Sequence, residues 1–227
     1  DPVTYHGRFV PEYFDSEKSN LLEAIRSIIN DKRDWADSRL LRTLCAGEPY
    51  AVPRLGDEET VDKLQALRVY DQYRQLISTA PLEIIYSGSA DLERVRLALA
   101  AAFATLPREE VRMISAAVPH VGRETVQYVE DALDVTQGKL GMGFSCGSSD
   151  MPALLMGNTL FGGSSNSKLF LNVREKLSLC YYASSLYHRQ KGLITVSSGI
   201  EFQNYQRAYD EIMAQLEAVQ KGELEDW

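Results

Sequence analysis

The hydrophobic and polar positions in the first part of the chain follow the period of an α-helix. Between residues 12 and 31, apolar side chains recur every three or four positions, at Leu21, Leu22, Ile25, Ile28 and Ile29. The same spacing predicts helices over 36–47, over 57–78 in one piece or two, and over 89–107. Gly47 and Ser89 suit the helix ends, because glycine accepts the left-handed conformation and serine caps backbone N–H groups.

One segment in this part has the pattern of a β-strand. The sequence PLEIIYSG at 81–88 is short, β-branched and aromatic, and Pro81 and Gly88 bound it. The periodicity stops after 107, and 108–122 ends in a Pro-His-Val-Gly step. This irregular segment predicts a linker between two domains, 1–107 and 123–227.

The second part of the chain alternates between strand and helix patterns. Strands are predicted over 123–131, 137–146, 180–188 and 192–202, and RQKG before the last strand is short enough for a hairpin turn. Helices are predicted over 148–163, over 165–179 with Ser165 or Asn166 as cap, and over 204–222 between Asn204 and Gly222. This order predicts an α+β fold, with helices packed on one face of a mostly antiparallel sheet.

Composition and charge narrow the classes of protein. The chain has 227 residues, of which 44% are hydrophobic and 25% charged, with a net charge of −8. The negative charge argues against nucleic acid or an anionic membrane as the main partner. No apolar run reaches the roughly 18 residues of a membrane span, and no signal peptide opens the sequence. Three scattered cysteines suggest reduced thiols, so we expect a cytoplasmic protein.

Motifs that carry chemistry are sparse. His6, His120 and His188 have no second ligand at helical spacing, and neither HExxH nor HxxEH occurs. The sequence therefore predicts no metal site within the chain. The glycine-rich FGGSSNSK at 161–168 lacks the spacing of a phosphate-binding loop, and it predicts a tight turn between two helices.

The stretch SSNSKLFLNVREKLSLCYYASS carries the strongest candidate site. Arg174 lies at the edge of an apolar helix stripe formed by Phe170, Val173 and Leu177. Tyr181 follows seven residues later, in the predicted strand. A guanidinium and a phenol at such a junction can hold a peptide carbonyl or a carboxylate. The pattern alone favours the simpler interpretation, a surface arginine beside a core tyrosine.

A family resemblance changes this balance. The string LFGGSSNSKLFLNVREKLSLCYY resembles the pitrilysin/insulinase-type zinc metallopeptidases, whose zinc motif is H-x-x-E-H. QGKLGMGF and GLITVSSGIEFQNYQRAYDEI resemble the same family, and GEPYAVPRLGDEETVDKL and IIYSGSADLERV are similar to the rear of its first domain. The resemblance implies the α+β fold of LuxS and the processing peptidases. It also implies two similar domains that close around a peptide.

In that family the first domain holds the zinc, and the second domain contributes an arginine and a tyrosine to the substrate site. Arg174 and Tyr181 match this substrate-binding pair. The peptide adds as a strand to a sheet edge. On this interpretation, residues 1–107 are the rear of the first domain, 108–122 the linker, and 123–227 the front of the second domain.

The chain departs from the family in its zinc site. The resemblance places H-x-x-E-H upstream of residue 1. The last zinc ligand should come from the helix at 12–31, but its position falls on Ala24. The neighbouring Glu23 is rotated away by about 100°. We therefore expect a non-catalytic member or fragment, with no catalytic residue, metal or cofactor of its own.

The expected partners are a peptide and a homologous catalytic subunit or domain that carries the zinc. Two alternatives stay open. The chain could be part of an active zinc metalloendopeptidase whose H-x-x-E-H segment lies upstream. It could also be a structural subunit, like the core proteins that resemble this family in respiratory complexes. Whether the chain belongs to an enzyme is therefore left open by its sequence.

Overall fold

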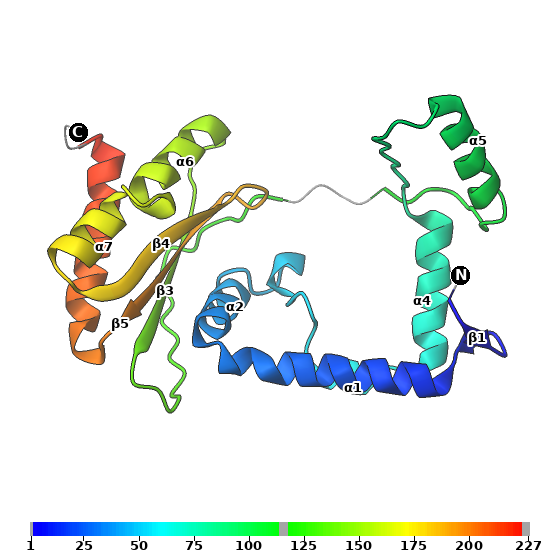
Figure 1. Cartoon of the computed structure of the whole chain (residues 1–227). Helices are drawn as coiled ribbons and strands as arrows, with labels where there is room; N and C mark the ends of the chain where they lie inside the picture. Colours follow the sequence, from blue (N-terminus) through cyan, green and yellow to red (C-terminus); the bar gives the residue numbers. More distant parts are fainter. Residues whose placement is uncertain (1, 114–117, 224–227) are drawn as a thin grey trace. The chain divides into compact units, whose positions relative to one another are not determined.

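The structure is a computed structural model, and it describes residues 2–113 and 118–223 (Figure 1). The chain divides into two compact units. The first unit comprises Asp1–Ile25 and Asp57–Ala116, and the second comprises Arg26–Gly56 and Ala117–Trp227. The predicted domain boundaries, 1–107 and 123–227 around a linker at 108–122, concern how the family's domains are divided, and they stay a prediction.

The first unit is mostly helical, as its periodicity predicts. Its elements are β1 (Thr4–Tyr5), β2 (Arg8–Phe9), most of α1 (Pro11–Ser27), α3 (Glu58–Asp62), α4 (Ala66–Thr79) and α5 (Leu92–Phe103). The predicted helix at 57–78 is therefore two helices. Asp91, rather than Ser89, caps α5, because its carboxylate accepts the N–H of Arg94 at 2.9 Å.

The strand prediction at 81–88 is wrong. No residue of this segment is in a strand, and no described strand pairs with it. Ile85 is 93% exposed, and Leu82 and Ile84 are also exposed. The strand predicted at 123–131 is likewise absent. An apolar, β-branched pattern makes a strand only where another strand accepts its backbone hydrogen bonds.

The second unit is built on a three-stranded antiparallel sheet. Its strands are β3 (Gly138–Ser145), β4 (Cys180–His188) and β5 (Leu193–Ile200), in the order β3-β5-β4. The hairpin pairs His188 with Leu193, as the RQKG turn predicts. Helical elements accompany the sheet: α2 (Lys32–Leu44), α6 (Met151–Asn158), the π-helical turns η3 (Thr159–Gly163) and η4 (Leu169–Lys176), and α7 (Tyr205–Lys221).

One face of the sheet forms the core of the second unit. Figure 1 shows α7 running beside the strands, and its buried Ala208 and Ile212 belong to the same apolar cluster as Met142, Val196 and Ile200. The helical run predicted from Ser165 or Asn166 begins later, because η4 starts at Leu169, and the Ser167 hydroxyl accepts the N–H of Phe170. The α+β class with an antiparallel sheet is confirmed.

The opposite face of the sheet packs against α2. Gly141 and Gly143 of β3 lie under Leu40 and Leu44 of α2, and a Cβ on Gly143 would come within 2.6 Å of the Leu44 side chain. Glycine is used here because the helix approaches the strand so closely. Within the part of the chain that the structure describes, no helix is long and apolar enough to cross a membrane.

Candidate functional site

Arg174 lies on the exposed side of η4. Its guanidinium stacks over the ring of Phe170, 4.7 Å from the ring centroid, and its side chain is 41% exposed. The Nη1 atom lies 3.5 Å from Oε1 of Glu175. An exposed ion pair of this kind is worth at most about 1 kcal/mol, so the guanidinium can exchange it for another acceptor.

A tight turn brings η4 back toward the sheet beside Arg174. Ser178 has a φ of +49°, and its N–H donates to the Arg174 carbonyl at 3.1 Å. Tyr181 is the extra residue of a β-bulge, because Cys180 pairs with Ile200 and Tyr182 pairs with Gly199. Tyr181 is therefore 51% exposed, and it is not part of the core.

The Tyr181 hydroxyl donates a hydrogen bond of 3.2 Å to Oε1 of Glu201. The Glu201 carboxylate raises the pKa of Tyr181, so the phenol keeps its proton at neutral pH. Arg174 and Tyr181 line one cavity of about 390 Å³, together with Glu175, Ser178, Leu179, Cys180, Glu201 and Asn204. The structure thus brings the two predicted residues to one hollow, and their role in binding a substrate stays a prediction.

Sequence reasoning missed Glu201, a carboxylate that lines this cavity. It directly follows β5, whose last residue, Ile200, pairs with Cys180. The hairpin register holds the signal: counting outward from the predicted RQKG turn, with His188 opposite Leu193, places residue 201 opposite Cys180, the neighbour of Tyr181 in the chain. Glu175 was also missed, because a charged residue beside Arg174 carries no motif of its own.

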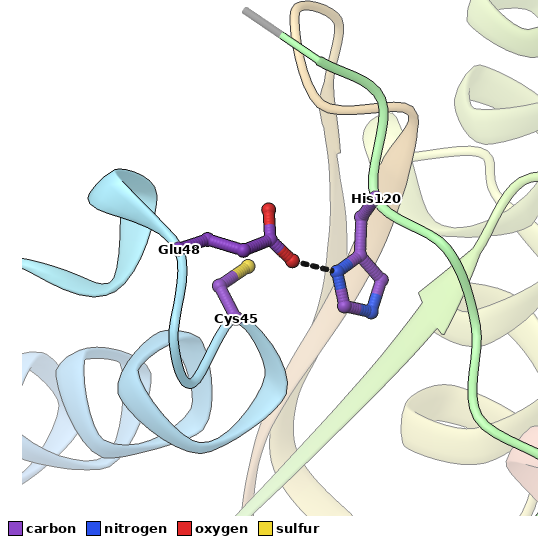
Figure 2. A group of neighbouring side chains, drawn as sticks. All are labelled: Cys45, Glu48 and His120. Atoms are coloured by element: carbon purple, nitrogen blue, oxygen red, sulfur yellow. Dashed lines mark hydrogen bonds and ion pairs between the residues drawn. The ribbon is translucent and has the colours of Figure 1, made fainter.

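A second cluster of polar side chains lies where the loop after α2 meets the β4–β5 turn. Figure 2 shows Cys45, Glu48 and His120, whose possible ligand atoms all lie within 4.8 Å of one another. His120 Nδ1 lies 2.5 Å from Oε1 of Glu48. The backbone N–H of His120 donates to the Lys191 carbonyl at 2.8 Å. His120, near the end of the segment predicted as a linker, is buried.

Lys191 supplies the positive charge of this cluster. The residue is 4% exposed, and its Nζ donates to Oε2 of Glu48 and to the carbonyl of Val118. Lys191 and then His120 lower the pKa of Glu48, while burial raises the pKa of the Cys45 thiol. Thiol, carboxylate and imidazole are zinc-type donors, but the ammonium already satisfies the carboxylate.

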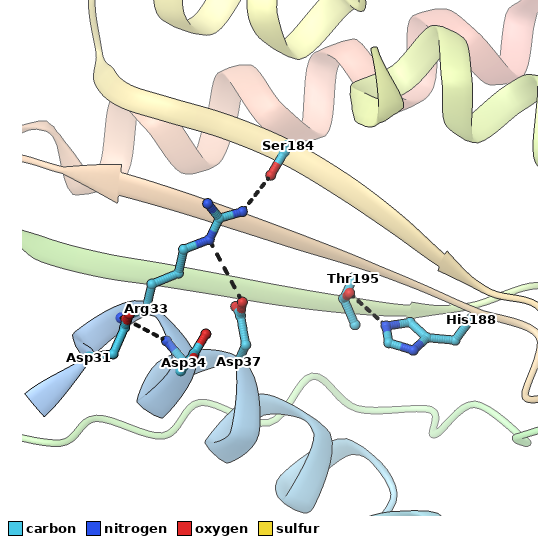
Figure 3. Close-up of polar contacts among 7 residues, drawn as sticks. All are labelled: Asp31, Arg33, Asp34, Asp37, Ser184, His188 and Thr195. Carbon is cyan, nitrogen blue, oxygen red and sulfur yellow. Dashed lines mark hydrogen bonds and ion pairs between the residues drawn. The ribbon is translucent and has the colours of Figure 1, made fainter. Parts of the chain in front are cut away.

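A third polar set joins α2 to the sheet (Figure 3). Arg33 Nη2 donates to Ser184 Oγ at 3.2 Å, and its Nε lies 4.0 Å from Asp37. His188 contacts Thr195 at 2.9 Å, and burial lowers the pKa of this imidazole. The Arg33–Ser184 hydrogen bond joins α2 to β4, so this face of the sheet is already occupied.

The predicted degenerate zinc position lies in α1, where Glu23 and Ala24 occupy successive positions. Among the described residues, the one group of three or more possible metal ligands is Cys45, Glu48 and His120, and it does not include Glu23. The absence of a metal from this chain stays a prediction.

The α+β unit with its Arg174–Tyr181 cavity has clear relatives. Residues 63–227 match the family model described as the peptidase M16 inactive domain. A probable inactive metalloprotease of Bacillus subtilis (strain 168), YmfF, is 36% identical over 99% of this chain and 53% of its own length. An uncharacterized zinc protease of Streptomyces coelicolor is 27% identical over 83% of this chain and 43% of its own.

A solved structure agrees with these relatives. The crystal structure of a conserved protein from Enterococcus faecalis V583 superposes with a TM-score of 0.85, at 27% identity over 98% of this chain and 53% of that one. The chain belongs to the peptidase M16 family. The family predicted from the Arg174–Tyr181 region is thus confirmed, and the chain spans about half the length of the relatives that it matches.

Proposed function

We propose that this chain is a non-catalytic part of an M16 protein that holds an extended peptide for a zinc-bearing partner to cut. The observation that carries the proposal is that Arg174 and Tyr181 line one cavity and are both accessible there. The description of the Bacillus subtilis relative as a probable inactive metalloprotease supports it.

The chemistry of the cavity suits a peptide backbone. The Arg174 guanidinium offers several N–H donors to a peptide carbonyl once it leaves Glu175. The Tyr181 phenol can donate to a carbonyl or accept a backbone N–H. Neither group is a nucleophile or a base at neutral pH. Both therefore hold and orient the peptide, and the chain needs no cofactor of its own.

The partner in this proposal is a homologous subunit or domain that carries H-x-x-E-H and its zinc, and the pair works in the cytoplasm as a dimer. The Streptomyces coelicolor relative favours a second function, in which the zinc motif belongs to the same polypeptide outside this chain. That relative is described as a zinc protease, and this chain spans only 43% of it.

Fluorescence anisotropy with a labelled, unstructured peptide tests the proposal. Arg174→Ala removes a charged hydrogen-bond donor and should weaken binding about tenfold or more. Tyr181→Phe should weaken binding by less. Arg189→Ala, on the β4–β5 turn, and Tyr13→Phe, in α1, are matched controls that should bind like the wild type.

Peptide binding that ignores both Arg174→Ala and Tyr181→Phe would overturn the proposal and favour a structural subunit. A second measurement addresses catalysis. The purified chain, incubated with Zn²⁺ and a fluorogenic peptide, should release no product. Cleavage that follows the chain through purification would show that it has a catalytic centre of its own.

A further inference from the structure

The cavity beside Arg174 contains a carboxylate that the proposed peptide-holding pair does not account for. Glu201 accepts one hydrogen bond from the Tyr181 hydroxyl at 3.2 Å and another from Nε2 of Gln203 at 2.9 Å. Both donors are neutral, so they fix the position of the carboxylate and leave its charge in place. Glu201 is exposed, and a ligand in the cavity can reach it.

The charges that line the cavity do not balance. Its charged residues are Arg174, Glu175 and Glu201, one cation and two anions. Glu175 already lies 3.5 Å from the guanidinium, so Glu201 is the carboxylate without a cationic partner among these three. A negative cavity attracts a cationic group of a ligand and repels a carboxylate of a ligand. The net charge of the whole chain, −8, acts in the same direction.

Exposed apolar side chains occur next to lining residues in the sequence. Leu177, Phe202 and Tyr205 each adjoin a lining residue in the chain, and all three are exposed. A lysine or arginine side chain has a long aliphatic stem and a charged tip, so it can cover apolar surface while its tip reaches a carboxylate. Aromatic rings also attract such cations directly. An exposed carboxylate in a net negative cavity therefore suits a basic side chain.

We propose that Glu201 is a specificity-determining residue, which selects a lysine or arginine side chain on a peptide whose internal carbonyl faces Arg174 and Tyr181. This inference rests on the proposed peptide-holding function. It also predicts which of two groups, a peptide carbonyl or a carboxylate, the Arg174–Tyr181 pair holds. A terminal carboxylate would bring a third anion into a cavity with one cation, so an internal carbonyl is the better ligand.

Three labelled peptides test this inference on the full chain. The peptides have blocked ends and a Gly/Ser/Ala sequence, and they differ at one central position, which is Lys, Gln or Glu. One exposed ion pair changes an affinity by about two- to fivefold. Because Lys to Glu replaces an attraction with a repulsion, the wild type should bind the Lys peptide about 4- to 25-fold more tightly than the Glu peptide.

Glu201→Gln should reduce this ratio to about twofold or less while the Gln peptide binds as before. Glu217→Gln, on α7, changes the net charge equally and should keep the wild-type ratio. A version of the Gln peptide with a free carboxyl terminus should bind more weakly than the blocked one. A ratio near one in the wild type, or a ratio unchanged by Glu201→Gln, would overturn the inference.

The two proposals fail in different ways. If Arg174→Ala abolishes binding of all three peptides while Glu201→Gln leaves their ratio unchanged, the peptide-holding function stands and the acidic subsite does not. If neither Arg174→Ala nor Tyr181→Phe weakens the binding of any peptide, the proposed function fails. A Lys preference that persists through Arg174→Ala but is lost in Glu201→Gln would then describe a separate basic-ligand site.

Discussion

Two apolar segments with the same sequence pattern end in opposite environments. GLITVSSGI contains β5, which pairs on both sides and includes the buried Val196 and Ile200. LEIIY at 82–86 has a similar β-branched and aromatic content, yet no described strand pairs with it and Ile85 is 93% exposed. The pattern of side chains indicates which residues can be buried. Whether they are buried depends on the presence of neighbouring strands that pair with the segment.

The largest expected effect comes from the same substitution at one isoleucine in each segment. Ile200 is 3% exposed in the core, so Ile200→Ala should lower the free energy of unfolding by about 2–5 kcal/mol. Ile85→Ala removes no packed contact and should change it by less than about 0.5 kcal/mol. Urea unfolding followed by circular dichroism measures both. Equal losses would mean that Ile85 is packed.

The comparison also explains which helices and strands could be predicted from the sequence. The helix at 12–31, the RQKG hairpin and the helix that ends at Gly222 depend on local spacing, turn length and a glycine with a φ of +72°. These were predicted because neighbouring residues determine them. The strands predicted at 81–88 and 123–131 depend on partners elsewhere, which a local pattern does not contain.

The same distinction applies to the candidate site. Arg174 and Tyr181 are close in sequence and part of a family motif, so they could be found. Glu201 is adjacent only across the hairpin. The cluster of Cys45, Glu48, His120 and Lys191 draws on three distant segments, none of which carries a recognisable motif, so nothing in the sequence pointed to it.

The second prediction concerns a polar contact whose groups are paired, the one between Glu48 and Lys191. Glu48→Gln leaves the buried Lys191 ammonium without its carboxylate, and it should lower the free energy of unfolding by about 1.5–3 kcal/mol at neutral pH. The exposed Glu217→Gln, which breaks only a surface pair with Lys221, is the control and should leave it unchanged.

The pKa of Glu48 predicts how the stability difference between the wild type and Glu48→Gln changes with pH. Lys191 and His120 lower the pKa of Glu48 in the folded chain. The stabilisation is therefore present above the pKa of the unfolded carboxyl, and it is lost as the pH falls through the folded value. The difference between wild type and Glu48→Gln should shrink on acidification. A difference that is constant from neutral to acid pH would show that the carboxylate charge is not its source.

The third prediction compares a glycine that has close neighbours with one that has none. A Cβ on Gly162 would lie 2.7 Å from the backbone nitrogen of Ser185 and from the Leu169 side chain. Gly162→Ala should therefore destabilise the chain by about 1–3 kcal/mol. Gly157 in α6 has nothing within 4 Å of the same position, so Gly157→Ala should stabilise it by about 0.5–1 kcal/mol. Thermal unfolding of both variants decides the signs.

The smallest expected effect on stability comes from changes in the unpaired segment at 82–86. The same changes should have a larger effect on self-association. Ile84→Ser with Ile85→Ser should leave the free energy of unfolding within about 0.5 kcal/mol of the wild type. An exposed apolar segment that lies outside any strand can pair with copies of itself, so the double variant should self-associate less in sedimentation velocity. Leu155→Ser with Met156→Ser removes two other exposed apolar side chains, which are 57% and 62% exposed, from α6, whose backbone is already hydrogen-bonded. If that control lowers association as much, exposed apolar area alone would drive it, and the missing strand partner would not be the cause.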